Sequence, residues 1–373
     1  MSTAADQQYM RRALQLAKQG DGRVQPNPMV GCVITKAGSV IGEGYHRRFG
    51  GPHAEIDALP RCTTTPRGAT VYVTLEPCCY HGQTPPCTDA LIAARVARVV
   101  ASVKDPSPRV AGRGLTKLRR AGIRVDVGLL SDEARALNAP FFKLVRTKRP
   151  WVILKWAQSL DGKIAARTGD SKWITDETCR KHVHRTRGRI DAIIIGVGTV
   201  LSDNPLLTCR AGRPRRLATR IIIDTKLRTP PASQLVQTAD QPPTWIFHGP
   251  DAPRLRARAL ENAGCVLHRV PTTARGVSLP AVLNTLGKRQ MTNVLVEGGS
   301  ALLGSFFDQK LADEYHVYIA PILIGGAAAP GPLGALGADK VAHALRLSSP
   351  STNSRPRLRP LGDGYLLQAR AQT

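Results

Sequence analysis

The stretch "EPCCYHGQTPPC", from Glu76 to Cys87, follows an apolar run and carries three cysteines, and "HAEIDAL", from His53 to Leu59, supplies a histidine and a glutamate upstream. Catalytic zinc takes three protein ligands, often imidazole or thiolate, and leaves the fourth position to water. One histidine and two of these cysteines would complete such a set.

The choice between the cysteines follows from their neighbours. Cys78 and Cys79 are adjacent, so at most one is expected to share a tetrahedral site with Cys87. Cys78 is favoured because it follows the rigid Pro77 directly, which leaves Cys79 to packing around the site. Cys87 opens a predicted helix, and a helix N-terminus favours the thiolate form of nearby cysteines. The expected ligands of one Zn²⁺ per chain are therefore His53, Cys78 and Cys87.

Glu55 is the expected proton shuttle of this site. It lies two positions after His53, about 200° around a regular helix, so the two side chains can reach one metal only from an irregular first turn. Zinc lowers the pKa of bound water to about 7, and a carboxylate beside the metal can accept the proton. H-x-E followed by P-C-x-x-C marks zinc deaminases that act on nucleobases. Here eight residues, rather than two, separate Cys78 from Cys87.

Length and composition indicate a globular protein of two domains. The chain has 373 residues, of which 42% are hydrophobic, and it exceeds the length of one typical domain. Helix and strand patterns restart after the charged "VRTKRP" at 145–150, which predicts domains at 1–147 and 148–373. The N-terminus does not resemble a signal peptide and no stretch approaches a membrane span, so a cytoplasmic, reduced protein is expected.

Periodicity predicts alternating helices and strands in both halves. The first half is expected to hold helices at 6–18, 53–59, 87–95, 114–121 and 131–144 and strands at 29–34, 70–75, 96–103 and 123–129. The second half is expected to hold helices at 178–187, 279–289 and 300–311, strands at 151–157, 191–196, 220–225, 244–248, 293–299 and 315–321, and two closing strands within 358–371. Both halves are therefore of the α/β class.

Three strand ends in the second half suggest a nucleotide-binding reductase. "NVLVEGGSALLGSF" runs from a strand through Gly298 and Gly299 into a helix at Ser300. Glycine lets a phosphate approach the backbone, and a helix N-terminus supplies N–H groups. "IGVGTVLSDNPLLT" (195–208) is interpreted as a strand that leads into a Gly-rich turn, and "KWAQSLDGKIA" (155–165) as a strand with a turn at its end. None of them matches G-x-G-x-x-G, so a Rossmann domain is not supported.

The segments "PNPMVGCVI" (26–34), "HAE" (53–55), "EPCCYHGQTPPC" and "DPSPRVAGRG" (105–114) together closely resemble the deaminase half of the bifunctional riboflavin-biosynthesis deaminase/reductase family, in which the longer cysteine spacing is usual. The glycine turns, in their order, resemble the reductase half of the same family. The resemblance covers nearly the whole chain. It implies a cytidine-deaminase-like three-layer αβα domain followed by a dihydrofolate-reductase-like α/β domain. It also implies zinc on His53, Cys78 and Cys87, Glu55 as proton donor and acceptor, and NADPH in the second domain.

The same resemblance implies the substrate and its contacts. The substrate is a diaminopyrimidinone that carries a ribosyl 5-phosphate; zinc-bound hydroxide would deaminate it, and NADPH would then reduce C1′ of the ribose to give a ribityl chain. Matching motifs imply pyrimidine contacts from Asn27, His46, His81 and Lys104, whereas Ser107 stands where the family pattern has an amide. The implied contacts to NADPH are Ala157, Trp173, Thr199, Asp203, Thr225, Gly299, Ser300, Ala301, Leu302, Leu303, Gly304 and Ser305. Asp203 is also expected to assist the reduction. The implied substrate contacts of the second half are Ser171, Arg187, Leu207, Arg210 and Glu297, whose arginines suit a phosphate.

Two other classes of protein stay open. The net charge of +26 is spread through both halves and attracts anions in general, although a lineage-wide bias towards arginine gives the same composition. A tRNA or other nucleic-acid adenosine or cytidine deaminase with an extra basic domain would bind RNA in a salt-dependent way. A zinc-stabilised binding protein would tolerate Glu55→Gln. The cysteine spacing and the second half favour the riboflavin-pathway enzyme, which in its family acts on a small molecule, needs no membrane or nucleic acid, and forms dimers or tetramers through the reductase domain.

Overall fold

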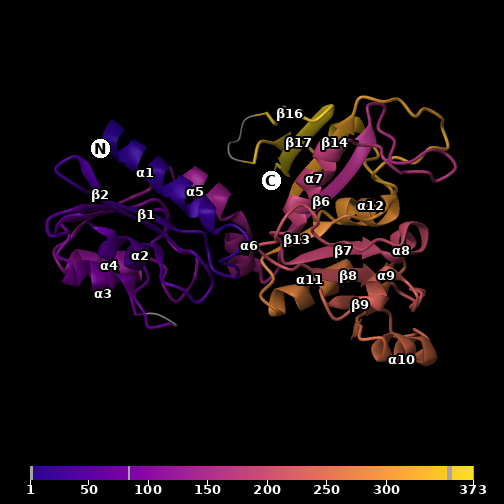
Figure 1. Cartoon of the computed structure of the whole chain (residues 1–373), viewed down its shortest axis with the longest axis horizontal. Helices are drawn as coiled ribbons and strands as arrows, with labels where there is room; N and C mark the ends of the chain where they lie inside the picture. The colour runs from indigo at the N-terminus through magenta and orange to yellow at the C-terminus, as the bar shows by residue number, and fades with distance from the viewer. Residues whose placement is uncertain (1–2, 83–84, 351–354, 373) are drawn as a thin grey trace. The chain divides into compact units, whose positions relative to one another are not determined.

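The computed structural model describes residues 3–82, 85–350 and 355–372 and divides into two compact units. Unit 1 comprises residues 1–148 and unit 2 comprises residues 149–373, so the division falls one residue after the expected boundary. The two units are coloured indigo to purple and magenta to yellow (Figure 1). In the part of the chain that the structure describes, no helix has both the length and the apolar character that crossing a membrane requires.

The sheet of unit 1 has the order β2-β1-β3-β4-β5. Its strands are β1 (Gly31–Lys36), β2 (Ser39–Tyr45), β3 (Thr70–Val73), β4 (Arg98–Ala101) and β5 (Arg124–Val127). β1 pairs antiparallel with both β2 and β3, and β3, β4 and β5 are parallel. The carboxyl ends of β2, β3 and β4 and the amino end of β1 therefore meet at one edge of the sheet. This edge collects four loops from different parts of the sequence.

Helices cover both faces of this sheet. One face packs against α1 (Ala4–Ala17), α5 (Ser131–Leu137) and α6 (Ala139–Thr147), and the other against α2 (Ala54–Ala58), α3 (Cys87–Ala93) and α4 (Arg113–Arg120). Short 3₁₀ turns follow α1 at Lys18–Gly20 and α2 at Leu59–Arg61. Each helix buries one apolar stripe, and the central strands β1, β3 and β4 are buried along most of their length. The expected three-layer αβα architecture is confirmed.

Two expectations for unit 1 were wrong. The single helix expected at 131–144 is two helices, because the chain leaves helical geometry at Asn138 and Pro140 opens α6. The side chain of Asn138 holds the backbone of Met29 through two hydrogen bonds of 2.8 Å. Strand β2 was not expected, because "SVIGEGY" is rich in glycine. A Cβ at Gly44 would lie 2.5 Å from the backbone nitrogen of Ala58, so glycine lets α2 pack directly on β2.

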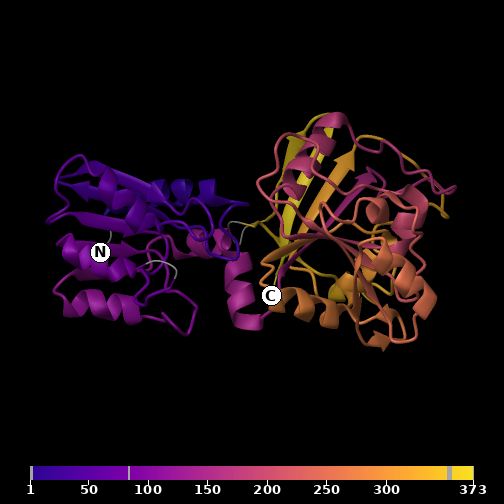
Figure 2. The same ribbon diagram turned by 60° about the horizontal axis from the view of Figure 1, so that its bottom comes forward.

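The main sheet of unit 2 has the order β10-β9-β8-β7-β13-β6-β14-β17-β15, with β16 beside β17. Its strands are β6 (Trp151–Ser159), β7 (Ala192–Gly196), β8 (Thr219–Ile223), β9 (Thr244–His248), β10 (Val266–Arg269), β13 (Asn293–Val296), β14 (Glu314–Ala320), β15 (Leu347–Ser348), β16 (Leu358–Leu361) and β17 (Gly364–Ala371); β11 (Thr272–Thr273) and β12 (Gly276–Val277) form a separate hairpin. Neighbouring strands are parallel along the part of the sheet that runs β10-β9-β8-β7-β13-β6-β14, and β17 runs antiparallel to β14. Figure 2 shows the yellow C-terminal strands beside the orange β14.

Helices also cover both faces of this parallel sheet, as buried parallel strands require. α11 (Leu279–Lys288) and α12 (Ser300–Asp308) pack on one face, and α8 (Val197–Asp203), α9 (Gln234–Gln237) and α10 (Arg254–Asn262) pack on the other. α7 (Glu177–Arg187) packs on β14 and β17, and a 3₁₀ turn occupies Val341–His343. The segment expected as a Gly-rich turn after β7 is the helix α8, so that expectation was wrong.

The order of the strands in unit 2 reverses at one point. β7, β8, β9 and β10 extend the sheet in one direction, and β13 then returns to the position between β7 and β6. In open α/β sheets, ligands bind outside the carboxyl ends of the strands where the strand order reverses. The segment after β13 begins at Glu297 and continues through the two glycines into α12. The fold therefore directs a ligand to this segment.

Candidate functional site

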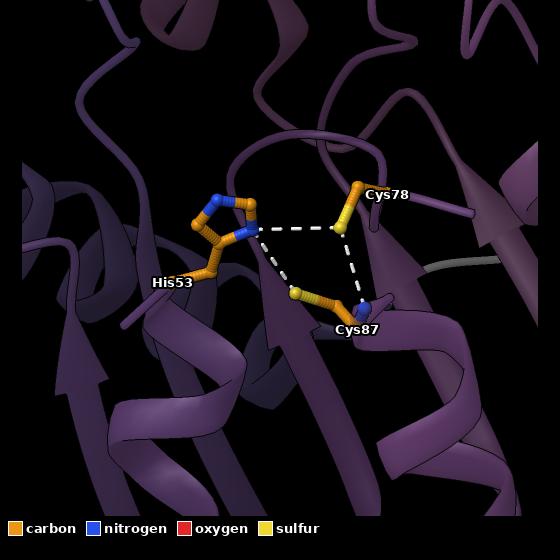
Figure 3. Close-up of side chains that lie close together, drawn as sticks. All are labelled: His53, Cys78 and Cys87. Carbon is orange, nitrogen blue, oxygen red and sulfur yellow. Dashed lines mark hydrogen bonds between the residues drawn. The ribbon is translucent and has the colours of Figure 1, made fainter. Parts of the chain in front are cut away.

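Three side chains converge at the carboxyl edge of the unit 1 sheet. His53 follows β2 and is the N-cap of α2, Cys78 follows β3, and Cys87 is the first residue of α3. Because β2 and β3 run in the same direction on either side of β1, the segments that leave them emerge at the same edge of the sheet. Figure 3 shows the imidazole and the two thiols pointing at one another. The structure thus brings together the three residues that the sequence motifs selected.

The spacing of these atoms fits a tetrahedral zinc ion. Nδ1 of His53 lies 3.3 Å from Sγ of Cys87 and 3.4 Å from Sγ of Cys78. All three ligand atoms lie within 4.8 Å of one another. Bond lengths of about 2.0 Å to nitrogen and about 2.3 Å to sulfur separate the nitrogen and sulfur ligand atoms of a tetrahedral site by about 3.5 Å. Cys79 is half-buried and is not part of the described cluster.

The two thiols differ in their protonation. Hydrogen bonds from the thiol and backbone N–H of Cys87, together with one from His53, lower the pKa of Cys78 to about 4. The hydrogen bond to Cys78, burial and the charge of Glu55 raise the pKa of Cys87. Helix dipoles were expected to favour thiolate at both cysteines, whereas these contacts favour thiolate at Cys78 and the thiol form at Cys87. A bound divalent cation deprotonates a coordinating thiol outright, so the second thiolate would form with the metal.

Glu55 lies inside this cluster and not on the surface. Its side chain is 3% exposed. Burial and the charge of Cys78 raise its pKa to about 7, against the opposing effect of His53. His53 precedes the first helical turn with an extended backbone, at ψ 165°, so the helical spacing that would separate it from Glu55 does not apply. Both side chains can therefore serve one site.

Of the four expected pyrimidine contacts, two lie beside the cluster and two are exposed. Nδ2 of Asn27 lies 3.3 Å from Nε2 of His46, and the rings of His46 and His53 meet edge to face at 5.5 Å. Burial lowers the pKa of His46, so its imidazole is neutral at pH 7. The structure brings Asn27 and His46 to the cluster. His81 and Lys104 are exposed, and no described contact joins them to it.

In unit 2 the expected cofactor residues follow the carboxyl ends of neighbouring strands. Thr199 lies in α8 after β7, and its hydroxyl accepts a hydrogen bond of 3.1 Å from the backbone N–H of Gly299, which precedes α12. Thr225 follows β8 and accepts from the backbone N–H of Val277. Ala157 lies near the end of β6. Asp203 ends α8 with an exposed carboxylate that accepts from Ser202.

Ser300, the first residue of α12, is held in place by other residues of unit 2. The hydroxyl of Ser300 donates to the carbonyl of Gly331 at 2.8 Å, and the backbone N–H of Gly334 donates to the carbonyl of Ser300. The expected contacts Ala301, Leu302, Leu303, Gly304 and Ser305 continue along the same helix. Leu303 and Gly304 are buried, so they lie on the side of α12 that faces the core of unit 2 and not the solvent.

A buried ion-pair cluster lies at the end of β13. Nε and Nη2 of Arg187 donate to the two carboxylate oxygens of Glu297 at 2.7 and 2.8 Å, and Nζ of Lys155 lies 3.5 Å from the same carboxylate. Burial opposes ionisation of Glu297, but the two cations lower its pKa to about 2. The fork of Arg187, expected to pair with a phosphate, thus holds Glu297. Lys155 was not selected from the sequence, although a lysine in the apolar run "WVILKWA" is a recognisable signal.

A basic pocket of about 620 Å³ lies beside α7. Its lining includes Trp173, Arg180, His184 and Arg210. Trp173 is 73% exposed, and the guanidinium of Arg180 lies 4.3 Å from the centre of its ring. Ser171 is exposed nearby and Leu207 is buried. The arrangement offers a cationic, open surface that suits an anionic ligand.

Family comparisons agree with this division. Residues 3–103 match the model of the cytidine and deoxycytidylate deaminase zinc-binding region, and residues 150–355 match the model of the RibD C-terminal domain. The two matches fall in units 1 and 2 respectively. The first range contains His53, Cys78 and Cys87, and the second contains the residues at the carboxyl ends of β6, β7, β8 and β13.

Whole-chain comparisons give the same result. The riboflavin biosynthesis protein RibD of Actinobacillus pleuropneumoniae is 45% identical over 94% of this chain and 93% of its own length, and that of Escherichia coli (strain K12) is 44% identical over 87% and 89%. The structure of Acinetobacter baumannii RibD, form 1, is similar with a TM-score of 0.85 at 35% identity, covering 99% of both chains. A diaminohydroxyphosphoribosylaminopyrimidine deaminase/5-amino-6-(5-phosphoribosylamino)uracil reductase from Thermotoga maritima is similar with a TM-score of 0.84 at 36% identity, covering 99% of both chains.

Proposed function

This chain belongs to the RibD family of riboflavin biosynthesis and is a deaminase joined to a reductase, and from that premise we propose which residues perform the two reactions. Unit 1 removes an amino group from a diaminopyrimidinone that carries a ribosyl 5-phosphate. Unit 2 then reduces the ribosyl group to a ribityl chain with NADPH. The observation that carries the proposal is the meeting of His53, Cys78 and Cys87 beside the buried Glu55.

In the deamination, His53, Cys78 and Cys87 hold one Zn²⁺ per chain. Zinc, when bound, lowers the pKa of water and so supplies a nucleophile at neutral pH. Glu55 would accept a proton from the attacking water and donate it to the amino nitrogen, which leaves as ammonia when its bond to the ring carbon breaks. A carboxyl whose pKa is raised to about 7 can perform both transfers near neutral pH. Asn27 and neutral His46 lie beside the cluster and orient the pyrimidine by hydrogen bonds.

In the reduction, the carboxyl ends of β6, β7, β8 and β13 bind NADPH. The cofactor supplies the hydride, and the protein supplies binding and orientation. Ala157, Thr199, Thr225 and the segment from Gly299 to Ser305 are the proposed contacts, with Trp173 and Asp203 at the exposed side. This proposal is supported by the hydrogen bond from Gly299 to Thr199, which joins two of the strand ends.

The substrate of unit 2 carries a phosphate, and we assign that phosphate to Arg210 in the basic pocket. Arg210 is exposed, whereas the fork of Arg187 is engaged by Glu297. Arg187 therefore serves the site by holding Glu297 in place against Lys155. Ser171, Leu207 and Glu297 are the further proposed contacts to the substrate.

Nucleic-acid deamination is not favoured. Unit 2 matches the RibD C-terminal domain over residues 150–355, and a nucleic-acid deaminase has no use for a reductase. We further propose that the protein is cytoplasmic and that it forms a homo-oligomer through unit 2. Light scattering after gel filtration would measure the molar mass and so the number of chains in the oligomer.

The test is incubation of the purified full chain with diaminohydroxyphosphoribosylaminopyrimidine, following ammonia release and NADPH oxidation separately. Ammonia is expected without NADPH, and NADPH oxidation is expected only after deamination. Ammonia release without any oxidation of NADPH would contradict the proposal for unit 2. Absence of ammonia release from zinc-containing protein would contradict the proposal for unit 1, and NADPH oxidation with the deaminated substrate would then test unit 2 separately.

A further inference from the structure

Glu76, the first residue of the "EPCC" stretch, binds the backbone of a distant segment. One carboxylate oxygen accepts from the backbone N–H groups of Asp105 at 3.2 Å and Gly112 at 2.9 Å. The other accepts from Gly114 at 3.0 Å and Leu115 at 3.4 Å. The carboxylate therefore closes the segment 105–115 around itself. These residues come together because β3 and β4 are parallel and their carboxyl ends adjoin.

The carboxylate is buried, with Glu76 4% exposed. Burying a carboxylate costs free energy unless it is hydrogen-bonded, and the described contacts of this carboxylate are backbone N–H groups. Two of them, from Gly114 and Leu115, belong to the first turn of α4, where the helix dipole favours a negative charge. Glu76 thus fixes both the loop 105–112 and the start of α4.

The same segment presses on the turn that carries Cys78. A Cβ at Gly114 would lie 2.1 Å from the carbonyl oxygen of Pro77 and 3.2 Å from Oε1 of Glu76. α4 therefore begins in direct contact with the Glu76–Cys78 turn. Lys104, an expected pyrimidine contact, immediately precedes the bound segment. A single side chain sets the distance between the cysteine turn and the loop that follows β4.

We propose that Glu76 is a positioning residue of the deaminase, which holds the segment from Asp105 to Leu115 against the turn that carries Cys78. It acts through the backbone of that segment and does not touch the substrate. This inference rests on the proposed deamination by unit 1. Its role goes beyond stability, because the anchored loop and the metal turn must keep one separation for the substrate to contact both.

Glutamine is the informative substitution. It keeps the length and shape of the side chain, but its NH₂ group would face two N–H donors that need an acceptor. Two hydrogen bonds are lost, and the N–H groups left behind are buried. Glu133 in α5 is exposed, so Glu133→Gln makes the same chemical change in the same unit without disturbing a buried contact.

The experiment compares Glu76→Gln, Glu133→Gln and the unaltered full chain by four measurements. These are zinc per chain, hydrogen exchange of peptides covering 104–115, kcat and KM for ammonia release, and NADPH oxidation with the deaminated substrate. For Glu76→Gln we expect faster exchange confined to 104–115 and unchanged zinc. We expect kcat/KM of deamination to fall about 10–100-fold, the range typical for outer partners of a metal site, mainly through KM. Reduction by unit 2 stays unchanged.

Gly114→Ala provides a second variant, since its Cβ pushes α4 from the Pro77 carbonyl while the carboxylate remains. It is expected to raise KM for deamination in the same way. Normal KM in both variants overturns the proposal, and so does a loss of zinc with unchanged exchange at 104–115. If Glu76→Gln unfolds unit 1 as a whole, Gly114→Ala decides alone. Failure of the unaltered chain to release ammonia would instead refute the deamination itself.

Discussion

Nδ1 of His53 lies 3.3 Å from Sγ of Cys87, although 34 positions separate the two residues in the sequence. The contact joins the cap of one helix to the first residue of another, and Cys78 completes the triangle from the turn after β3. The same atoms that hold this arrangement together would hold a metal. A substitution that disturbs these contacts would therefore affect both metal binding and deamination.

Cys87→Ser is expected to abolish zinc binding, because a hydroxyl does not replace a thiolate ligand. The loss of zinc affinity should exceed the roughly 10–100-fold that follows from removing a residue that hydrogen-bonds to a metal ligand. Metal analysis after dialysis measures it. Cys79→Ser is the matched control, since Cys79 is adjacent in sequence but outside the described cluster, and it should retain one zinc per chain. Equal zinc in both variants would show that the ligand set is wrong.

Glu55→Gln is expected to lower the rate of ammonia release by about 100- to 10,000-fold, the usual contribution of general acid–base catalysis. Glutamine keeps the shape of the buried side chain but cannot accept a proton. Zinc content and NADPH oxidation with the deaminated substrate should be unchanged, which separates loss of chemistry from loss of folding. Full deaminase activity in this variant would exclude the proton transfer proposed for Glu55.

Glu297→Gln is expected to destabilise unit 2 by about 3–5 kcal/mol at pH 7, because Lys155 and Arg187 would be left as buried charges without a partner. The folded pKa of Glu297 is about 2, below its ordinary value of 4.5. A carboxylate with a lowered folded pKa stabilises the fold above its unfolded pKa and loses that effect as the pH falls. The difference in unfolding temperature between the unaltered chain and the variant should therefore shrink from about pH 4.5 towards about pH 2. Glu261→Gln, an exposed change in α10, should show no such difference at any pH.

Arg220→Met is expected to lower the free energy of unfolding by about 3 kcal/mol, since each buried polar group left without a partner costs about 1–3 kcal/mol. Arg220 is fully buried on β8, and its guanidinium donates to the backbone carbonyls of Leu235, Thr238 and Pro242. Methionine fills a similar volume but donates no hydrogen bond. Calorimetry would measure the change, with Arg256→Met on exposed α10 as the control. Identical unfolding temperatures for the two variants would refute this account of Arg220.

Local patterns predicted most elements of both sheets. Runs of β-branched residues marked β1, β3, β4, β5, β6, β7, β8, β9, β13 and β14, and the turn in "LRPLGDGYLLQARA" marked β16 and β17. Three of the failures have identifiable causes. β2 contains glycines that exist for the close contact with α2, and α8 follows glycines that resemble a turn. The break at Asn138 serves a tertiary contact with Met29, and no periodicity in 131–144 announces it.

The sequence by itself determined which side chains can bind a metal and move a proton, because the order H-x-E and P-C, with a second P-C before a helix, is a property of neighbouring residues. Tertiary structure alone decided which of them meet. His53, Cys78 and the Glu76-bound loop share one edge because β2, β3 and β4 run in the same direction. Lys155 and Arg187 likewise reach Glu297 only through the place of β13 between β7 and β6. Direction and order of strands follow from the packing of the whole sheet, and no local stretch of residues specifies them.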